Sequence, residues 1–241
     1  MGDEVSTRAT AVESELLDNL MWHSLVGPHA HLSEGSGLVR RYHPDVALFV
    51  AVELVSREAW DALQELVGPK RTVLLTGATV AAVPDGWVRH FQGLGHQMVL
   101  RRPEQLAPVD PSVRIETMTA ADVPQMLALV EVTQPGPFRP RTIEMGSYFG
   151  VYDGDRHLIA LAGERLRAGG YTEVSAVATH PTARRRGLAA LLTSHVARHI
   201  ASRGDTPMLH VASTNVTAKR VYDRLGFESR KQLDWVAVET P

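Results

Sequence analysis

Residues 177–189 read Val-Ala-Thr-His-Pro-Thr-Ala-Arg-Arg-Arg-Gly-Leu-Ala, which is the pattern of a strand end, a basic turn and a helix that opens on Gly187. The first turn of a helix has N–H groups with no intrahelical partner and carries the positive end of the helix dipole, so an anion is stabilised there. Gly187 has no Cβ to keep a phosphate from the backbone, and Ala189 is also small. The run from Arg184 to Arg186 adds positive charge. The spacing therefore predicts a polyphosphate site.

Two regular elements must position this turn. Upstream, Tyr171 to Thr179 is rich in β-branched residues and follows Ala-Gly-Gly, which predicts a strand. Downstream, apolar residues from Leu188 to Ile200 fall at helical spacing, and Gly204 is placed to end that helix. The predicted phosphate loop thus joins a strand to a helix.

A second strand and helix follow. Residues 207–211 form a short apolar run typical of a buried strand. Asn215 is then a candidate N-cap for a helix that Gly226 ends, with Phe227 packing back on it. Tyr222 lies on this helix, where it is either an ordinary core residue or a functional one.

These two stretches together resemble a known family. The spacing Arg184-x-x-Gly187-x-Ala189 resembles the [Gln/Arg]-x-x-Gly-x-[Gly/Ala] signature of the GNAT superfamily of acyl-CoA-dependent N-acyltransferases, and Asn215-x-x-Ala-x-x-x-Tyr-x-x-Leu-Gly-Phe227 looks like its second signature. The resemblance implies that the loop holds the pyrophosphate of coenzyme A, with acetyl-CoA as the co-substrate. It also implies a mixed α/β fold for the C-terminal half.

The resemblance also implies roles for single residues. Tyr222 matches the general acid that protonates the leaving thiolate, and Asn215 would hold the pantetheine or acyl carbonyl. Glu173 is the first choice for general base, with Glu144 and Glu164 as rivals and a solvated strand end as the alternative reading. Lys219 is expected to reach a ribose or phosphate oxygen, and backbone N–H groups near Val177 to Thr179 to stabilise the oxyanion. The expected cofactor-binding set is Val177, Ala178, Thr179, Arg184, Arg185, Arg186, Gly187, Leu188, Ala189, Asn215 and Lys219.

Composition restricts the class of protein. The chain has 241 residues, 44% of them hydrophobic, with a net charge of -2, so neither a nucleic-acid partner nor a membrane partner is expected. No apolar signal segment is visible, and a cytoplasmic location is the expectation. Cysteine is absent, so acyl transfer through an acyl-cysteine is not expected. His195 and His199 have a spacing that can bind zinc, but no general-base Glu lies between them and no metal is predicted.

The chain divides into four predicted segments. Residues 1–15 are a polar tail, 16–102 a smaller α/β lobe, 103–112 a proline-rich linker and 113–241 the GNAT acetyltransferase domain. The first lobe has strand-like runs at 38–42, 46–53, 71–76 and 96–101 and a helical run at 57–67.

The N-terminal lobe is similar in element order to the degenerate, cofactor-free lobe of two-lobed GNAT proteins of the glycine N-acyltransferase type. It has no phosphate loop. The nearest approach is residues 92–97, Gln-Gly-Leu-Gly-His-Gln, which we interpret as a turn because Gln97 is bulky where a small residue is needed.

The predicted function is transfer of an acetyl group from acetyl-CoA directly to a primary amine, by a sequential mechanism. The acceptor is a small-molecule or protein amine that the sequence does not identify, and a homodimer stays open. A non-catalytic acyl-CoA sensor is the alternative. A nucleotide-phosphate enzyme is disfavoured, because no Lys-[Ser/Thr] follows the loop.

Overall fold

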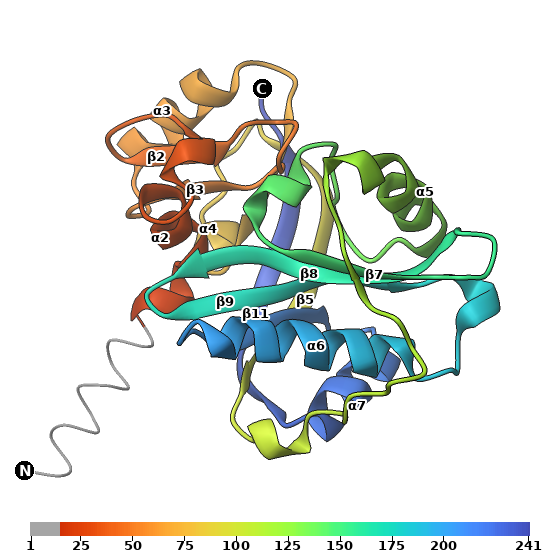
Figure 1. The fold of residues 1–241 in the computed structure, drawn as a ribbon. Coiled ribbons are helices and arrows are strands. Elements are labelled where there is room, and N and C mark those ends of the chain that lie inside the picture. The colour runs from red at the N-terminus through yellow and green to blue at the C-terminus, as the bar shows by residue number, and fades with distance from the viewer. Residues whose placement is uncertain (1–14) are drawn as a thin grey trace, which may run out of the picture.

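The computed structural model describes residues 15–241 and is built on one large mixed sheet (Figure 1). Its eight strands lie in the order β4-β11-β5-β10-β9-β8-β7-β6. Their bounds are β4 Thr72–Thr76, β5 Val88–Leu100, β6 Glu116–Thr117, β7 Tyr148–Tyr152, β8 Leu158–Ala168, β9 Tyr171–Thr179, β10 Thr206–Ala212 and β11 Phe227–Glu239. A second sheet holds β1 Ser33–Glu34, β2 Val39–Tyr42 and β3 Val50–Val52.

Helices cover both faces of the large sheet. They are α2 Leu20–Val26, α3 Arg57–Val67, α4 Ala78–Ala81, α5 Val123–Thr133, α6 Leu188–Ser202 and α7 Val216–Arg224, with short 3-10 turns at Ala30–Leu32, Pro103–Gln105, Ala120–Asp122, Thr142–Met145 and Pro181–Ala183. Helices α6 and α7 lie on one face, and α5 and the N-terminal elements lie on the other (Figure 1). Within residues 15–241, no helix combines the length and apolar character that crossing a membrane requires.

Strand alternation divides the core between the two faces. Leu209 and Met98 pack in the same hydrophobic cluster as Leu192 of α6 and Tyr222 of α7. Their neighbours Met208 and Val99 point the other way, into a cluster built with α2. We call these the α6 face and the opposite face.

The two halves of the chain repeat one order of elements and exchange their last strands. The first half runs β3-α3-β4-α4-β5, and the second runs β9-α6-β10-α7-β11. Each half contains a parallel contact. In the first half, Phe49, directly before β3, bridges to Leu74 of β4, and in the second half Val174 of β9 pairs with Leu209 of β10. Yet β5 pairs with β10, β11 pairs with β4, and β5 and β11 pair with each other. One continuous sheet therefore joins both halves.

The expected α/β fold is confirmed, and several predicted elements lie where the sequence placed them. The helix at 57–67 and the strand at 171–179 have the predicted bounds. The interpretation of residues 92–97 as a turn is wrong: they form the middle of β5, which begins at Val88 rather than at residue 96. Gly93 and Gly95 resemble turn residues in the sequence, but here their missing side chains make room for aromatic rings on the sheet.

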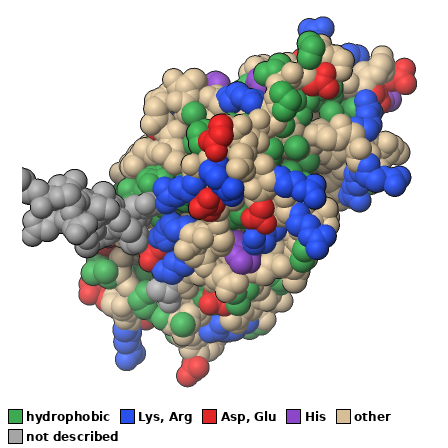
Figure 2. All heavy atoms as spheres, turned by 90° about the horizontal axis from the view of Figure 1, so that it is seen from below, with side chains coloured by type: hydrophobic (Ala, Val, Ile, Leu, Met, Phe, Trp, Pro, Cys, Tyr) green, Lys and Arg blue, Asp and Glu red, His purple; other side chains and the backbone are tan. Residues whose placement is uncertain are grey.

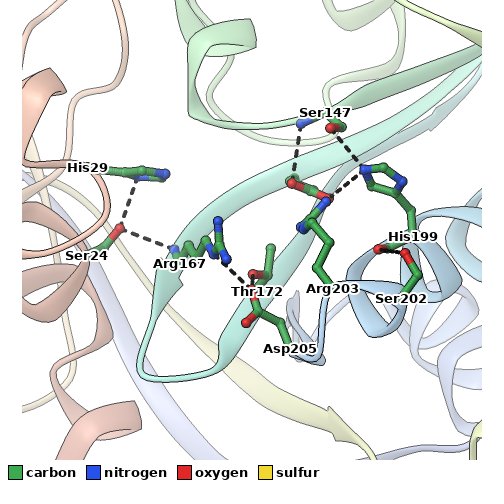
Figure 3. A network of polar contacts seen from close by, with 10 residues as sticks. Ser24, His29, Ser147, Arg167, Thr172, His199, Ser202, Arg203 and Asp205 are labelled. Atoms are coloured by element: carbon green, nitrogen blue, oxygen red, sulfur yellow. Dashed lines mark hydrogen bonds and ion pairs between the residues drawn. The ribbon is translucent and has the colours of Figure 1, made fainter.

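A buried polar cluster connects the N-terminal elements to β8. The Ser24 hydroxyl lies 3.0 Å from Nδ1 of His29 and 2.9 Å from the Tyr42 hydroxyl, and it accepts a hydrogen bond from the backbone N–H of Arg167 (Figure 3). His29 is only 4% exposed. Burial lowers the pKa of His29 from 6.5 to about 4, so the ring is neutral at pH 7.

This cluster predicts a loss of stability in mild acid. Between pH 6.5 and pH 4 the unfolded chain binds a proton at His29 that the folded chain does not, so stability falls as the pH falls through that window. The full shift corresponds to about 3 kcal/mol. We expect urea unfolding to show lower stability at pH 5 than at pH 7, and a smaller pH difference in His29→Gln. His157→Gln is the control, since that side chain is 76% exposed. An unchanged pH difference in His29→Gln would contradict the assignment.

Candidate functional site

The site begins where two parallel strands separate. Strands β9 and β10 pair from Tyr171 with Thr206 to Val174 with Leu209, and not beyond. Past that point β9 contains a bulge, with Ala176 at a φ of 53° and a shift in its register against β8. Strand β10 continues to Ala212 on the side of β5. An opening therefore forms between the carboxyl ends of β9 and β10.

The predicted phosphate loop follows β9 directly. Arg185 and Gly187 both have left-handed backbones, with φ of 64° and 78°. Alternation of left-handed and ordinary residues turns successive N–H groups toward one side, which makes an anion-binding concavity. Gly187 is the N-cap of α6 and supplies no side-chain cap, so the first N–H groups of the helix stay available. A Cβ built on Gly187 meets nothing within 4 Å, so the space in front of the loop is open.

Positive charge surrounds the loop without being neutralised. Arg185 and Arg186 are exposed and make no hydrogen bond or ion pair with residues 15–241, while Arg184 donates a long hydrogen bond of 3.4 Å to the carbonyl of Thr179. Figure 2 shows the molecule from the side of α6 and α7, with Lys and Arg side chains spread across that face. These guanidinium groups are free to bind phosphates.

Helix α7 carries the second predicted motif and begins shortly after the end of β10. The Asn215 side chain accepts a hydrogen bond of 3.1 Å from the backbone N–H of Ala218 and so caps the helix. Tyr222 is 8% exposed and packs edge to face against Phe227 at 6.2 Å. Burial raises the pKa of Tyr222 to about 12, so the phenol is protonated at neutral pH.

Two buried hydroxyls lie at the ends of β9 and β10. Oγ1 of Thr179, the last residue of β9, and Oγ of Ser213, just after β10, make no hydrogen bond with any residue that the structure describes. Buried polar atoms without partners are uncommon in proteins and mark places where a ligand can bind. Sequence reasoning identified Thr179 but missed Ser213, although its position between a strand and the Asn215 cap was a usable signal.

Glu173 lies away from solvent, on the opposite face from α6. Its oxygens accept hydrogen bonds of 2.6 and 2.8 Å from the Arg165 guanidinium, and the residue is 0% exposed. Burial alone would raise the pKa of Glu173, but Arg165 and then His210 outweigh it and hold the pKa well below its usual value. A carboxylate held in this way accepts a proton poorly.

The rival carboxylates are held by arginines as well. Glu144 makes hydrogen bonds of 2.7 and 2.8 Å with Arg141. Glu164 lies 2.8 Å from Arg203, which follows the last residue of α6. Lys219, expected to contact the ligand, instead pairs with Asp223, with both distances at 3.0 Å. The arginine loop thus follows the end of β9 and Asn215 follows the end of β10, while Glu173, Glu144 and Glu164 are each paired with an arginine.

His210 is a site neighbour that sequence reasoning missed. Because an ionised Glu173 only accepts hydrogen bonds, Nδ1 of His210 must donate the 2.7 Å bond to it. Nε2 lies 3.2 Å from the amide nitrogen of Gln97 and must accept from it. The geometry therefore gives the Nδ1 proton to the bond with Glu173. No spacing rule could reveal the contact, because Arg165, Glu173 and His210 come from three different strands.

The residues at the opening fit coenzyme A. The open N-terminus of α6 and the unpaired arginines suit phosphates, and the unpartnered hydroxyls and the gap between β9 and β10 suit the polar, extended pantetheine arm. Within the described part of the chain, no three His, Asp or Glu side chains are grouped so that they could hold a metal ion.

Comparisons with known proteins agree with this geometry. The family model described as FR47-like protein matches residues 148–236, which include β9, α6, β10 and α7. No match was found among curated proteins. A GCN5-related N-acetyltransferase from Kribbella flavida shares the fold at a TM-score of 0.57 and 19% identity, over 96% of this chain and 95% of that one. A GNAT-family acetyltransferase from Colwellia psychrerythraea has a TM-score of 0.52 and 16% identity, over 84% and 80%.

A closer likeness extends over the whole molecule. A GNAT-family protein from Novosphingobium aromaticivorans is 34% identical, with a TM-score of 0.83, over 93% of this chain and 98% of that chain. This level of identity over nearly the full length of both chains, together with the site geometry, shows the family: the protein belongs to the GNAT superfamily.

Proposed function

We propose that the protein binds acetyl-CoA at the opening between β9 and β10 and transfers the acetyl group directly to a primary amine. The observation that carries the proposal is the loop from Arg184 to Gly187. Its two left-handed residues leave the first N–H groups of α6 without a side-chain cap, beside Arg185 and Arg186, which have no partner among residues 15–241. This arrangement suits a diphosphate, because the N–H groups at the start of a helix and the arginines beside them both favour an anion.

The chain's own residues have defined tasks in this reaction. Acetyl-CoA, when bound, supplies an activated thioester carbonyl. The neutral amine attacks the carbonyl carbon, the carbon–sulfur bond breaks, and one proton passes from the amine to the sulfur. We assign the stabilisation of the negative charge that develops on the carbonyl oxygen to backbone N–H groups near Val177 to Thr179, where the register of β9 against β8 shifts. The chain has no cysteine to carry the acetyl group, which favours direct transfer.

Tyr222 is the proposed proton donor to the sulfur. With its pKa at about 12, complete transfer to a thiolate of ordinary pKa near 8.5 is uphill by about 5 kcal/mol. Hydrogen bonding from the phenol therefore stabilises the leaving sulfur before the proton moves. Glu173 does not take the proton from the amine in this proposal. Its part is the hydrogen bond that it accepts from His210.

A second function, a non-catalytic acyl-CoA sensor, is favoured by one observation. Glu173, Glu144 and Glu164 each have an arginine partner, so none of these carboxylates is ready to act as a base. Acetyl transfer to a panel of amines, measured beside coenzyme A binding, separates an enzyme from a sensor.

The loop proposal predicts a loss of affinity in Gly187→Ala. A left-handed backbone strains any residue with a Cβ, and this Cβ would also lie in the proposed phosphate cradle. We expect calorimetry to show coenzyme A binding weakened at least tenfold. The matched control is Gly204→Ala, at the other end of α6. Gly204 has a φ of 86° and nothing within 4 Å of its built Cβ, so the strain is similar and the cradle is untouched. Equal affinities in the two variants would contradict the loop assignment.

The proton-donor proposal predicts that Tyr222→Phe lowers kcat by about 100-fold, the lower end of the range for general acid catalysis. The ring and its contact with Phe227 remain, so the dissociation constant of acetyl-CoA is expected to stay within twofold. Steady-state kinetics and calorimetry measure the two effects. An unchanged kcat removes Tyr222 from the chemistry, and an absence of transfer to any amine in the parent protein supports the sensor.

A further inference from the structure

A row of aromatic rings runs along the opposite face from α6. The rings belong to Phe91 on β5, Trp235 on β11 and His210 on β10, and Gly93 and Gly95 of β5 lie beneath two of them. We call these five residues the aromatic strip. Gly95 is paired with Ala212 and Gln97 with His210, so alternation places all of these on one face. The strip lies on the face that α6 and α7 leave uncovered.

Two glycines allow the rings to lie flat on the sheet. A Cβ on Gly93 would lie 2.7 Å from the ring of Phe91, and a Cβ on Gly95 would lie 2.4 Å from the indole of Trp235. The indole in turn meets the His210 ring edge to face at 6.2 Å. Phe91 is 56% exposed, although it is large and apolar. Trp235 is half-buried and the His210 side chain is 10% exposed, so the strip is open to solvent at Phe91 and more buried toward His210.

The strip ends at the proposed reaction centre. Leu209, the last residue of β10 that pairs with β9, directly precedes His210. The phosphate loop lies at the start of α6, so a thioester carried from that face through the opening emerges beside His210. The rings therefore extend from the point of transfer toward Phe91 at the outer end.

The charges along the strip do not suit a polycation. Strands β5 and β10 contain no acidic residue. On β11, Glu228 lies 3.0 Å from Arg102, Asp234 alternates to the other face, and Glu239 lies 3.4 Å from His90. Glu173 at the inner end is neutralised by Arg165. A ligand on the strip meets aromatic surface rather than unpaired carboxylates.

We propose that the aromatic strip binds the body of the acceptor, and that the acceptor is an arylalkylamine whose amino group lies at the inner end near His210. This inference rests on the proposed function and adds the class of acceptor. An apolar surface disfavours the ammonium form, so the strip favours the neutral amine that the reaction needs. The nitrogen forms the amide bond, the sulfur leaves, and the sulfur gains the proton that the nitrogen loses.

Binding of 2-phenylethylamine to the free protein tests the strip without any turnover. We expect calorimetry at pH 9 to show binding that is at least tenfold tighter than that of spermidine. Phe91→Ala should weaken it at least fivefold, and Gly95→Ala, which displaces the indole, should do the same. Leu54→Ala is the matched control, since Leu54 is 73% exposed and lies outside the strip. Equal binding in the parent, Phe91→Ala and Leu54→Ala would overturn the inference.

Kinetics with acetyl-CoA separates this inference from the proposed function. Acetylation of 2-phenylethylamine, with KM raised at least fivefold in Phe91→Ala, supports both. Acetylation of spermidine or a blocked lysine in preference to 2-phenylethylamine overturns the acceptor class and leaves acetyl transfer standing. Binding of 2-phenylethylamine that depends on Phe91, without transfer to any amine, supports the strip and overturns the enzyme.

Discussion

Strand β10 is hydrogen-bonded to β5 as far as Ala212, while β9 leaves it after Leu209. This unequal support creates the opening. Beyond Leu209, β10 no longer pairs with β9. It still pairs with β5 on its other edge, and that pairing satisfies the backbone groups on that edge. Because β5 comes from the first half of the chain, the exchange of strands between the halves stabilises the site of the second half.

The same opening separates two environments. On the α6 face, N–H groups without a side-chain cap lie beside arginines that have no partner in the described part of the chain, which makes this face positive. On the opposite face, Glu173 and Arg165 neutralise each other under the N-terminal elements, His210 is hydrogen-bonded to Glu173, and aromatic rings replace charge. A ligand that crosses the sheet therefore passes from an anion-binding surface to an apolar one, which suits a molecule with phosphates at one end and an acyl group at the other.

Glycines have different tasks at the two sides. Gly187 provides a left-handed backbone and an open cradle at the start of α6. Gly93 and Gly95 have ordinary strand positions, and their value is the missing Cβ beneath Phe91 and Trp235. The first kind of glycine is recognisable from local pattern, because it stands between a strand and a helix. The role of Gly95 is not recognisable in this way, because its partner Trp235 is distant in the sequence.

The sequence alone determined the strand and the helix that flank Arg184 to Gly187 and the helix that carries Asn215 and Tyr222, because each depends on neighbours within a few residues and on helix capping. Only the tertiary structure decided that Glu173 is bound to Arg165, that residues 92–97 are a strand, and that β5 and β11 change places. The physical reason is the same in all three cases. Pairing between strands, and between side chains on neighbouring strands, is set by the register of segments far apart in the chain, which local periodicity does not encode.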